Sequence, residues 1–181
     1  MKIKFFGEKS FLVHGKTGNF FLNPPENCTE KCDFAIFSET EKMQNLPTKK
    51  IFSLPCEAEI SEILIHGIFS SPENVVFKIL VDGVSCVHFG ELLEIPSGDF
   101  FEKLGEKIDI IFLPLSENFD AKKAKNLIDQ IDPRAVFFCG DSQFFPEISK
   151  NFKIQNLQNS TEISRQKLSD EKTEIFIFSE N

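Results

Sequence analysis

Alternating apolar and polar positions predict short strands along the first third of the chain. Residues 2–6 and 10–14 show this alternation, and the Gly15-Lys16-Thr17-Gly18 turn leads into a third strand over residues 19–22. The Pro24-Pro25 pair then ends the pattern, because proline has no N–H to donate to a sheet ladder. Further strands are predicted over residues 33–38 and 50–54, and one or two within 60–69.

The rest of the chain adds a hairpin, buried strands and one clear helix. Residues 75–81 and 84–89 flank Asp82-Gly83, which is a strong hairpin signal. Apolar residues recur at helical spacing between an N-cap candidate, Asp120, and Pro133. We also expect a short helix over 99–105 and strands over 108–113, 135–139 and 174–178. Strands in both halves with few helices and no linker predict one layered α/β domain over residues 1–181.

Composition narrows the classes of protein to consider. The 181 residues are enough for one domain with a substantial core. A net charge of −8 opposes binding to nucleic acid, which needs clustered Lys and Arg. No apolar run reaches the roughly 18 residues of a membrane span, and the first residues do not resemble a signal peptide. We therefore expect a cytoplasmic protein with no membrane or nucleic-acid partner; a protein partner or homo-oligomer is left open.

The cysteines and aromatic residues add little chemistry. Five cysteines occur without a C-x-x-C pair, so free thiols are expected; Cys28 and Cys32 could begin a zinc site, but no second pair follows. The chain has 22 Phe and neither Tyr nor Trp, so its aromatic side chains carry no hydrogen-bonding group. They are expected to pack in the core.

Several segments, taken in order, resemble a known superfamily. These are the opening residues 3–12, the stretch 19–25, the piece His88-Phe89-Gly90-Glu91-Leu92, the strand and proline of 108–115, and the closing residues 160–178. Together they resemble the metallo-β-lactamase superfamily, in particular its small bacterial, lactonase-like zinc-dependent hydrolases. The resemblance implies a four-layer αββα sandwich and a metal-dependent hydrolase site.

The departures from this resemblance fall on the implied metal ligands. Where the superfamily carries H-x-H-x-D-H after a buried strand, this chain has Glu39, Glu41, Met43 and Gln44. The Asp of the H-x-G-D piece is Glu91, and the opening His is Glu8. The late His falls on Cys139 or Gly140. The imidazole ligands implied for zinc are missing, and carboxylates alone suit harder cations, so we expect no bound zinc and no other cofactor.

Two functions compatible with the resemblance stay open, and a third hypothesis treats the resemblance as accidental. The first is a degenerate, non-catalytic protein with a binding or scaffold role. The second is a divergent hydrolase whose acidic rim holds Mg²⁺ or Mn²⁺, which prefer oxygen donors; its members would be Glu8, Glu39, Glu41, Glu91 and Asp141. The third is a plain α/β interaction domain. His88 could pair with Glu91, although a satisfied strand histidine is the ordinary expectation.

Overall fold

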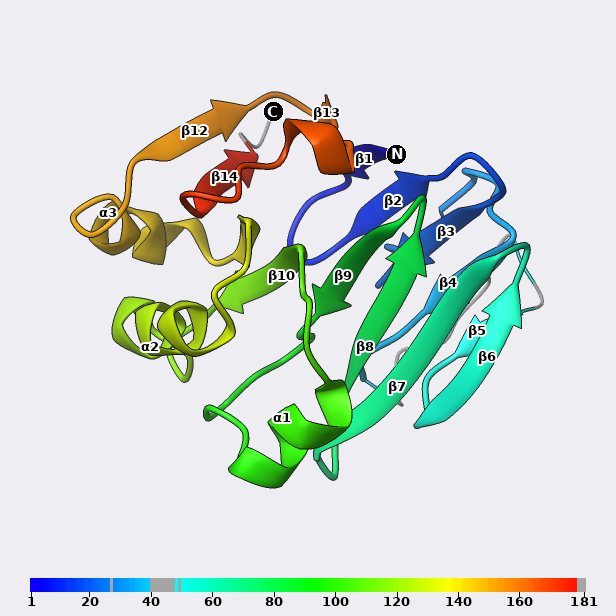
Figure 1. Ribbon diagram of the computed structural model, residues 1–181, viewed down its shortest axis with the longest axis horizontal. Coiled ribbons are helices and arrows are strands. Elements are labelled where there is room, and N and C mark those ends of the chain that lie inside the picture. The colour runs from blue at the N-terminus through cyan, green and yellow to red at the C-terminus, as the bar shows by residue number, and fades with distance from the viewer. Residues whose placement is uncertain (27, 40–47, 49, 179–181) are drawn as a thin grey trace.

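Two β-sheets face each other in the computed structural model, which describes residues 1–26, 28–39, 48 and 50–178 (Figure 1). The smaller sheet has the strand order β13-β1-β2-β3-β4-β5. Its strands β13, β1, β2 and β3 pair antiparallel, whereas β3, β4 and β5 run parallel. The bounds are β1 Lys2–Phe5, β2 Phe11–His14, β3 Asn19–Leu22, β4 Phe34–Ile36, β5 Ile51–Phe52 and β13 Ser160–Glu162.

The larger sheet has eight strands in the order β12-β14-β11-β10-β9-β8-β7-β6. One half, from β12 to β9, is parallel, and the other half, from β9 to β6, is antiparallel. The bounds are β6 Cys56–Ile60, β7 Ile63–Ser71, β8 Asn74–Val81, β9 Val84–His88, β10 Ile110–Leu115, β11 Ala135–Gly140, β12 Ile154–Leu157 and β14 Glu174–Phe178.

Phenylalanine rings fill the space between the two sheets. The ring of Phe11 from the smaller sheet lies 4.7 Å from that of Phe112 in the larger one, centroid to centroid. Phe137 stacks between Phe112 and Phe176 at 5.4 and 5.0 Å. Each fully buried side chain of this size contributes about 1.5–3 kcal/mol through loss of apolar surface to water. The absence of Tyr and Trp fits this core, because a buried hydroxyl or indole N–H would need a partner.

The helices cover the outer face of the larger sheet. They are α1 Gly98–Leu104, α2 Ala121–Ile131 and α3 Phe145–Ile148, and the residues they bury form one apolar cluster with that face (Figure 1). Helix α2 begins as predicted, because the Asp120 carboxylate accepts hydrogen bonds from the N–H groups of Lys122 and Lys123. It ends at Asp132, whose φ of 51° lies in the left-handed region. Two single-turn 3₁₀ helices lie at Ser142–Phe144 and Arg165–Lys167.

The outer face of the smaller sheet is covered differently. Its buried side chains, which alternate with those of the inter-sheet core, are Leu12, Phe21, Ala35 and Phe37. Phe6, Cys28 and Cys32 pack onto them from loops. Of the predicted four-layer αββα sandwich, the two facing sheets and the helical layer on the larger sheet are confirmed. On the outer face of the smaller sheet the described residues form irregular chain.

The sequence prediction differs from the structure most in the segment 56–71. A second strand, Cys56–Ile60, precedes Ile63–Ser71, and the two are joined at Ser61 and Glu62. Both linking residues have positive φ, 49° and 66°, as a tight two-residue hairpin requires. Ser and Glu are not the residues usually found in this type of turn, so the hairpin was not predicted.

Within the described part of the chain, no helix combines the length and the apolar character that a membrane span requires.

Candidate functional site

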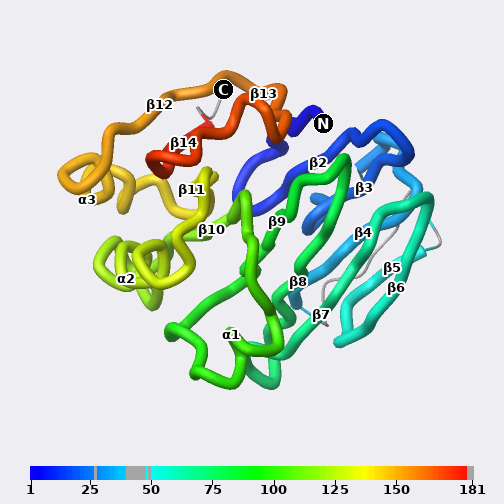
Figure 2. The backbone as a smooth tube through the Cα atoms, viewed as in Figure 1, coloured from blue at the N-terminus to red at the C-terminus, as the bar shows by residue number. Residues whose placement is uncertain are grey.

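Four of the implied ligand positions, Glu8, Glu39, Glu91 and Gly140, meet at one rim of the sandwich. The β1–β2 loop, the end of β4, the start of β8, the turn after β9 and the end of β11 come together there, and Figure 2 follows the chain through these turns. Two backbone hydrogen bonds hold the rim: Val75 N–H donates to Ser38 O at 2.8 Å, and Gly140 N–H donates to Glu8 O at 2.9 Å. The first joins the two sheets, and an isolated bridge between Glu39 and Asn74 continues it.

Asn74 fixes the turn after β9. Its amide nitrogen donates to Phe89 O at 2.9 Å, and its amide oxygen accepts from Glu91 N–H at 2.8 Å. The side chain is buried, so these bonds lie away from competing water. Between them stands Gly90 with a φ of +62°, the left-handed conformation that glycine adopts without a steric cost. The backbone of Glu91 is thereby held at the rim.

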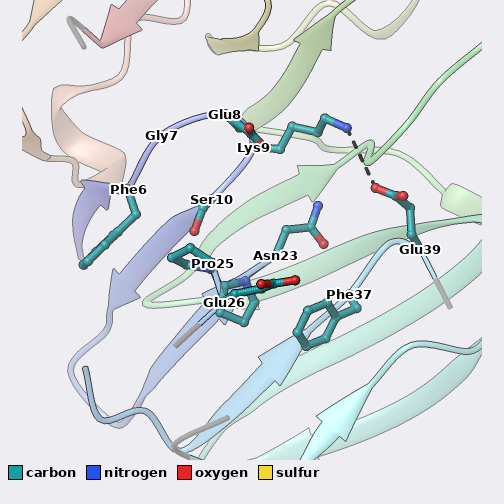
Figure 3. A pocket seen from close by; sticks show the side chains of 11 residues that line it. Phe6, Gly7, Glu8, Lys9, Ser10, Asn23, Pro25, Glu26, Phe37 and Glu39 are labelled. Carbon is teal, nitrogen blue, oxygen red and sulfur yellow. Dashed lines mark ion pairs between the residues drawn. The ribbon is translucent and has the colours of Figure 1, made fainter. Parts of the chain in front are cut away.

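Lys9 lies between two carboxylates of this rim. Its ammonium group donates to Glu91 Oε1. The same group lies 3.8 Å from Glu39 Oε1, an ion pair that Figure 3 shows. The three side chains are partly buried, with exposed fractions of 19% for Lys9, 27% for Glu39 and 35% for Glu91. The pairs are therefore less screened than surface ion pairs, although solvent still reaches them.

His88 lies beneath the rim in a small polar network. Ser38 N–H donates to Asn23 Oδ1 at 2.9 Å, which fixes the orientation of the Asn23 amide. Asn23 Nδ2 then faces His88 Nε2 at 3.0 Å, so that Nε2 accepts and the ring proton sits on Nδ1. Among the described residues Nδ1 has no hydrogen-bond partner. Burial, assisted by the charge of Lys9, lowers the pKa of His88 to about 3, so the ring is neutral.

Two cavities flank the Lys9 side chain. One, of about 480 Å³, is lined by Phe6, Ser10, Pro25, Phe37 and other residues of the smaller sheet's loops (Figure 3). The other, of about 440 Å³, lies toward Glu91, Ser116 and Asp141. Glu8 and Lys9 line both. The Lys9 loop therefore stands between two adjoining hollows of the same rim.

The structure brings most of the predicted positions together. Glu8, Glu39, Glu91 and Gly140 lie on this rim, and Asp141 lines the 440 Å³ cavity. Glu41, Met43 and Gln44 lie outside the described residues. Cys139 is buried in the inter-sheet core, and this burial raises the pKa of its thiol to about 12.

The pair considered between His88 and Glu91 is not formed within the described part of the chain. His88 bonds to Asn23 from inside the sandwich, whereas the Glu91 carboxylate bonds to Lys9 at the rim. The physical reason is the Gly90 turn, which follows the buried end of β9 and carries Glu91 away from the core. His88 is a buried strand histidine, as ordinarily expected, but only its Nε2 is satisfied, by Asn23, and its Nδ1 has no hydrogen-bond partner among the described residues.

Three residues of the rim were missed in the sequence: Lys9, Asn23 and Asn74. Each stands in a loop or at a strand end where Lys and Asn are unremarkable. Lys9 does adjoin Glu8 at the implied position of the opening His, which was the one available signal. The rim contacts that matter here, Lys9 with Glu91, Asn23 with Ser38 and Asn74 with Phe89, join residues at least 15 positions apart, so no local pattern could show them.

Zinc, which the resemblance implies, does not fit the described residues. No group of three or more His, Cys, Asp or Glu side chains in residues 1–26, 28–39, 48 and 50–178 is placed to hold a metal ion. The acids nearest each other bond to Lys9, and the buried His88 accepts from Asn23. At Gly140 a Cβ atom would lie 2.5 Å from Leu115 O, so a ligand side chain at this position would collide with the backbone.

Comparison with known proteins supports the fold. Residues 58–138 match the family model of the beta-lactamase superfamily domain. A metallo-β-lactamase superfamily protein from Thermotoga maritima superposes with a TM-score of 0.86 at 18% identity, covering 99% of this chain and 100% of that one. Igni18, a metallo hydrolase from Ignicoccus hospitalis, gives 0.66 at 14% identity, covering 90% and 99%.

A third structure, the metallo-β-lactamase-fold protein YhfI from Bacillus subtilis, gives a TM-score of 0.62 at 10% identity, covering 97% of this chain and 95% of that one. No curated protein sequence matches the chain. Identities this low establish the fold and leave the chemistry to be argued from the residues. The chain has the metallo-β-lactamase fold, as the sequence resemblance predicted.

Proposed function

We propose that the protein is a non-catalytic member of this fold with a binding or scaffold role. One observation carries the proposal: the place of the late metal ligand can supply no donor. Cys139 points into the inter-sheet core, and Gly140, with φ of +86°, has the Leu115 carbonyl oxygen 2.5 Å from where a Cβ would stand. Without a donor at this position, a substitution at one other position cannot restore the set of zinc ligands.

The loss of zinc would also remove the nucleophile. Zinc in such enzymes lowers the pKa of a bound water to about 7 and so supplies hydroxide at neutral pH. Among the described residues, the neutral, buried His88 is no substitute base, because its accepting nitrogen already bonds to Asn23. A binding role would use the 480 Å³ cavity, whose walls combine the rings of Phe6 and Phe37 with polar Ser10 and Asn23.

The alternative is a hydrolase that uses Mg²⁺ or Mn²⁺ on a carboxylate-rich site. The observation in its favour is that Glu8, Glu91 and Asp141 line one cavity of about 440 Å³. Oxygen donors and an open, wet site are what these harder cations prefer. In this alternative a divalent ion would have to displace the ammonium group of Lys9 from Glu91.

Metal analysis and a hydrolase panel test the proposal together. We expect purified protein to contain no stoichiometric zinc by elemental analysis, and to leave lactones, phosphodiesters and thioesters intact with or without Mg²⁺ or Mn²⁺. Glu39→Ala and Glu91→Ala serve as site variants, and Glu30→Ala, which removes an exposed ion pair with Lys4, is the matched control. One or two zinc ions per chain, or hydrolysis lost only in the site variants, would overturn the proposal.

A further inference from the structure

The loop that carries Lys9 is held rigidly at the rim. Gly7 and Glu8 both have positive φ, 95° and 48°, which turn the chain sharply after β1. Ser10 N–H donates back to Gly7 O at 2.9 Å, and Glu8 O accepts from Gly140 N–H of the other sheet. Lys9 therefore starts from a fixed backbone, and its side chain extends across the rim toward Glu39 (Figure 3).

The two acids that Lys9 meets are positioned independently of it. Glu39 takes part in the backbone bridge with Asn74, and Glu91 N–H donates to the Asn74 side chain. Asn74 thus holds the backbone of both residues at the same rim through contacts that do not involve Lys9. Two like charges held close together in partly buried positions repel each other, so this arrangement needs a positive charge between them.

We propose that the ammonium group of Lys9 takes the place of a metal ion at this rim, as a covalently attached cation that holds Glu39 and Glu91. Both acids stand where the sequence resemblance puts metal ligands, and they come from loops of different sheets. The ammonium group joins these loops across the sandwich. It offers three N–H donors and no Lewis acidity, so it can neutralise the carboxylates but cannot activate water as a metal does.

This inference goes beyond the proposed function and does not depend on it. Its central consequence is that the positive charge of Lys9 excludes divalent cations from the two carboxylates. When that charge is removed, Glu39 and Glu91 are left as paired oxygen donors next to a wet cavity, a combination that suits Mg²⁺ or Mn²⁺. Metal binding should therefore appear in the variant and be absent from the natural protein.

The variant Lys9→Met tests this, because methionine keeps much of the apolar stem while losing the charge. In metal-free buffer we expect its Tm to fall by about 2–4 °C, the change that a loss of partly exposed ion pairs produces in a domain of this size. Adding Mn²⁺ to about ten times the Kd of the new site should raise the Tm of Lys9→Met by about 3–6 °C. The natural protein should show no such rise.

Two further variants separate this result from a general effect of charge. Lys4→Met breaks an ion pair of the same sheet, Lys4 Nζ to Glu30 Oε1 at 2.6 Å, and should gain no response to Mn²⁺. The triple variant Lys9→Met/Glu39→Gln/Glu91→Gln should lose the response that Lys9→Met gained. Electron paramagnetic resonance of free Mn²⁺ gives the stoichiometry directly, with about one ion per chain expected in Lys9→Met alone.

Three outcomes would overturn the proposal. They are a Lys9→Met protein that binds no Mn²⁺ or Mg²⁺, an equal response in the natural protein, and a response that survives in the triple variant. If Lys9→Met does not fold without metal, refolding in Mn²⁺ decides: recovery of the folded state supports the proposal, and no recovery overturns it. Zinc content and hydrolase activity of the natural protein, which test the proposed function, do not enter this result.

Discussion

Gly90→Ala should be one of the most damaging small substitutions in this protein. Gly90 has a φ of +62°, and the left-handed conformation costs an L-residue about 1–2 kcal/mol. A Cβ at this position would also lie 2.6 Å from Ser38 Oγ and closer still to Ser38 Cβ and Asn74 Oδ1. Those atoms are tied into hydrogen bonds at the junction of the sheets, so they cannot move freely, and forcing them apart costs about 1–3 kcal/mol more.

We therefore expect Gly90→Ala to lose about 2–5 kcal/mol of unfolding free energy, which lowers Tm by roughly 5–20 °C in a domain of this size. Gly83→Ala is the matched control, because Gly83 has a similar φ of +73° but nothing within 4 Å of the added Cβ. It should lose only about 1–2 kcal/mol. Urea unfolding of both variants measures the difference. If they differ by less than about 0.5 kcal/mol, the argued overlap with Ser38 and Asn74 is wrong.

Three more predictions concern the buried groups around the rim. Asn23→Ala should cost about 1–3 kcal/mol in urea unfolding, because it leaves the N–H of Ser38 without its acceptor. The pKa of His88 is lowered to about 3 in the folded protein, so below the ordinary value of 6.5 only the unfolded chain binds a proton there. The free energy of unfolding should therefore fall as the pH drops from 7 to 4. It should fall less steeply in His88→Leu over the same range. Iodoacetamide should spare buried Cys86 and Cys139, whose thiol pKa values are raised by burial, as peptide mass mapping of the native protein would show.

Local patterns in the sequence predicted the elements whose signals are local. Asp120 and Pro133 mark the ends of α2, and Asp82-Gly83 marks the β8–β9 hairpin, because capping and tight turns depend on a few adjacent residues. The Ser61–Glu62 turn was missed since its residues adopt positive φ without being the usual Asn or Gly. Glu39 and Glu91, which the resemblance names as positions of metal ligands, both lie beside Lys9, and periodicity alone could not have predicted this proximity.

The partner of those acids could not be predicted, because it depends on the fold as a whole. Lys9 is 82 residues from Glu91 and 30 from Glu39, and nothing near it in the sequence distinguishes it from a solvated lysine. The same holds for Asn23 and His88, which are 65 residues apart. A resemblance can thus name candidate site positions in advance, whereas the contacts that those residues make across the sandwich need the structure.

The rim explains how the fold can persist while its chemistry changes. Its two sheets are joined by Val75 N–H to Ser38 O, and its key turn is held by the Asn74 amide, so neither junction uses a metal ion. If a metal had been the main support of the rim, loss of the donors would have loosened these loops. Because backbone hydrogen bonds and the Asn74 amide supply the support, we expect substitutions of the Glu39 and Glu91 side chains to leave the scaffold intact. The packing of the Gly90 turn and the charge of Lys9 therefore contribute to the rim through different atoms, and the Gly90 and Lys9 variants probe the two separately.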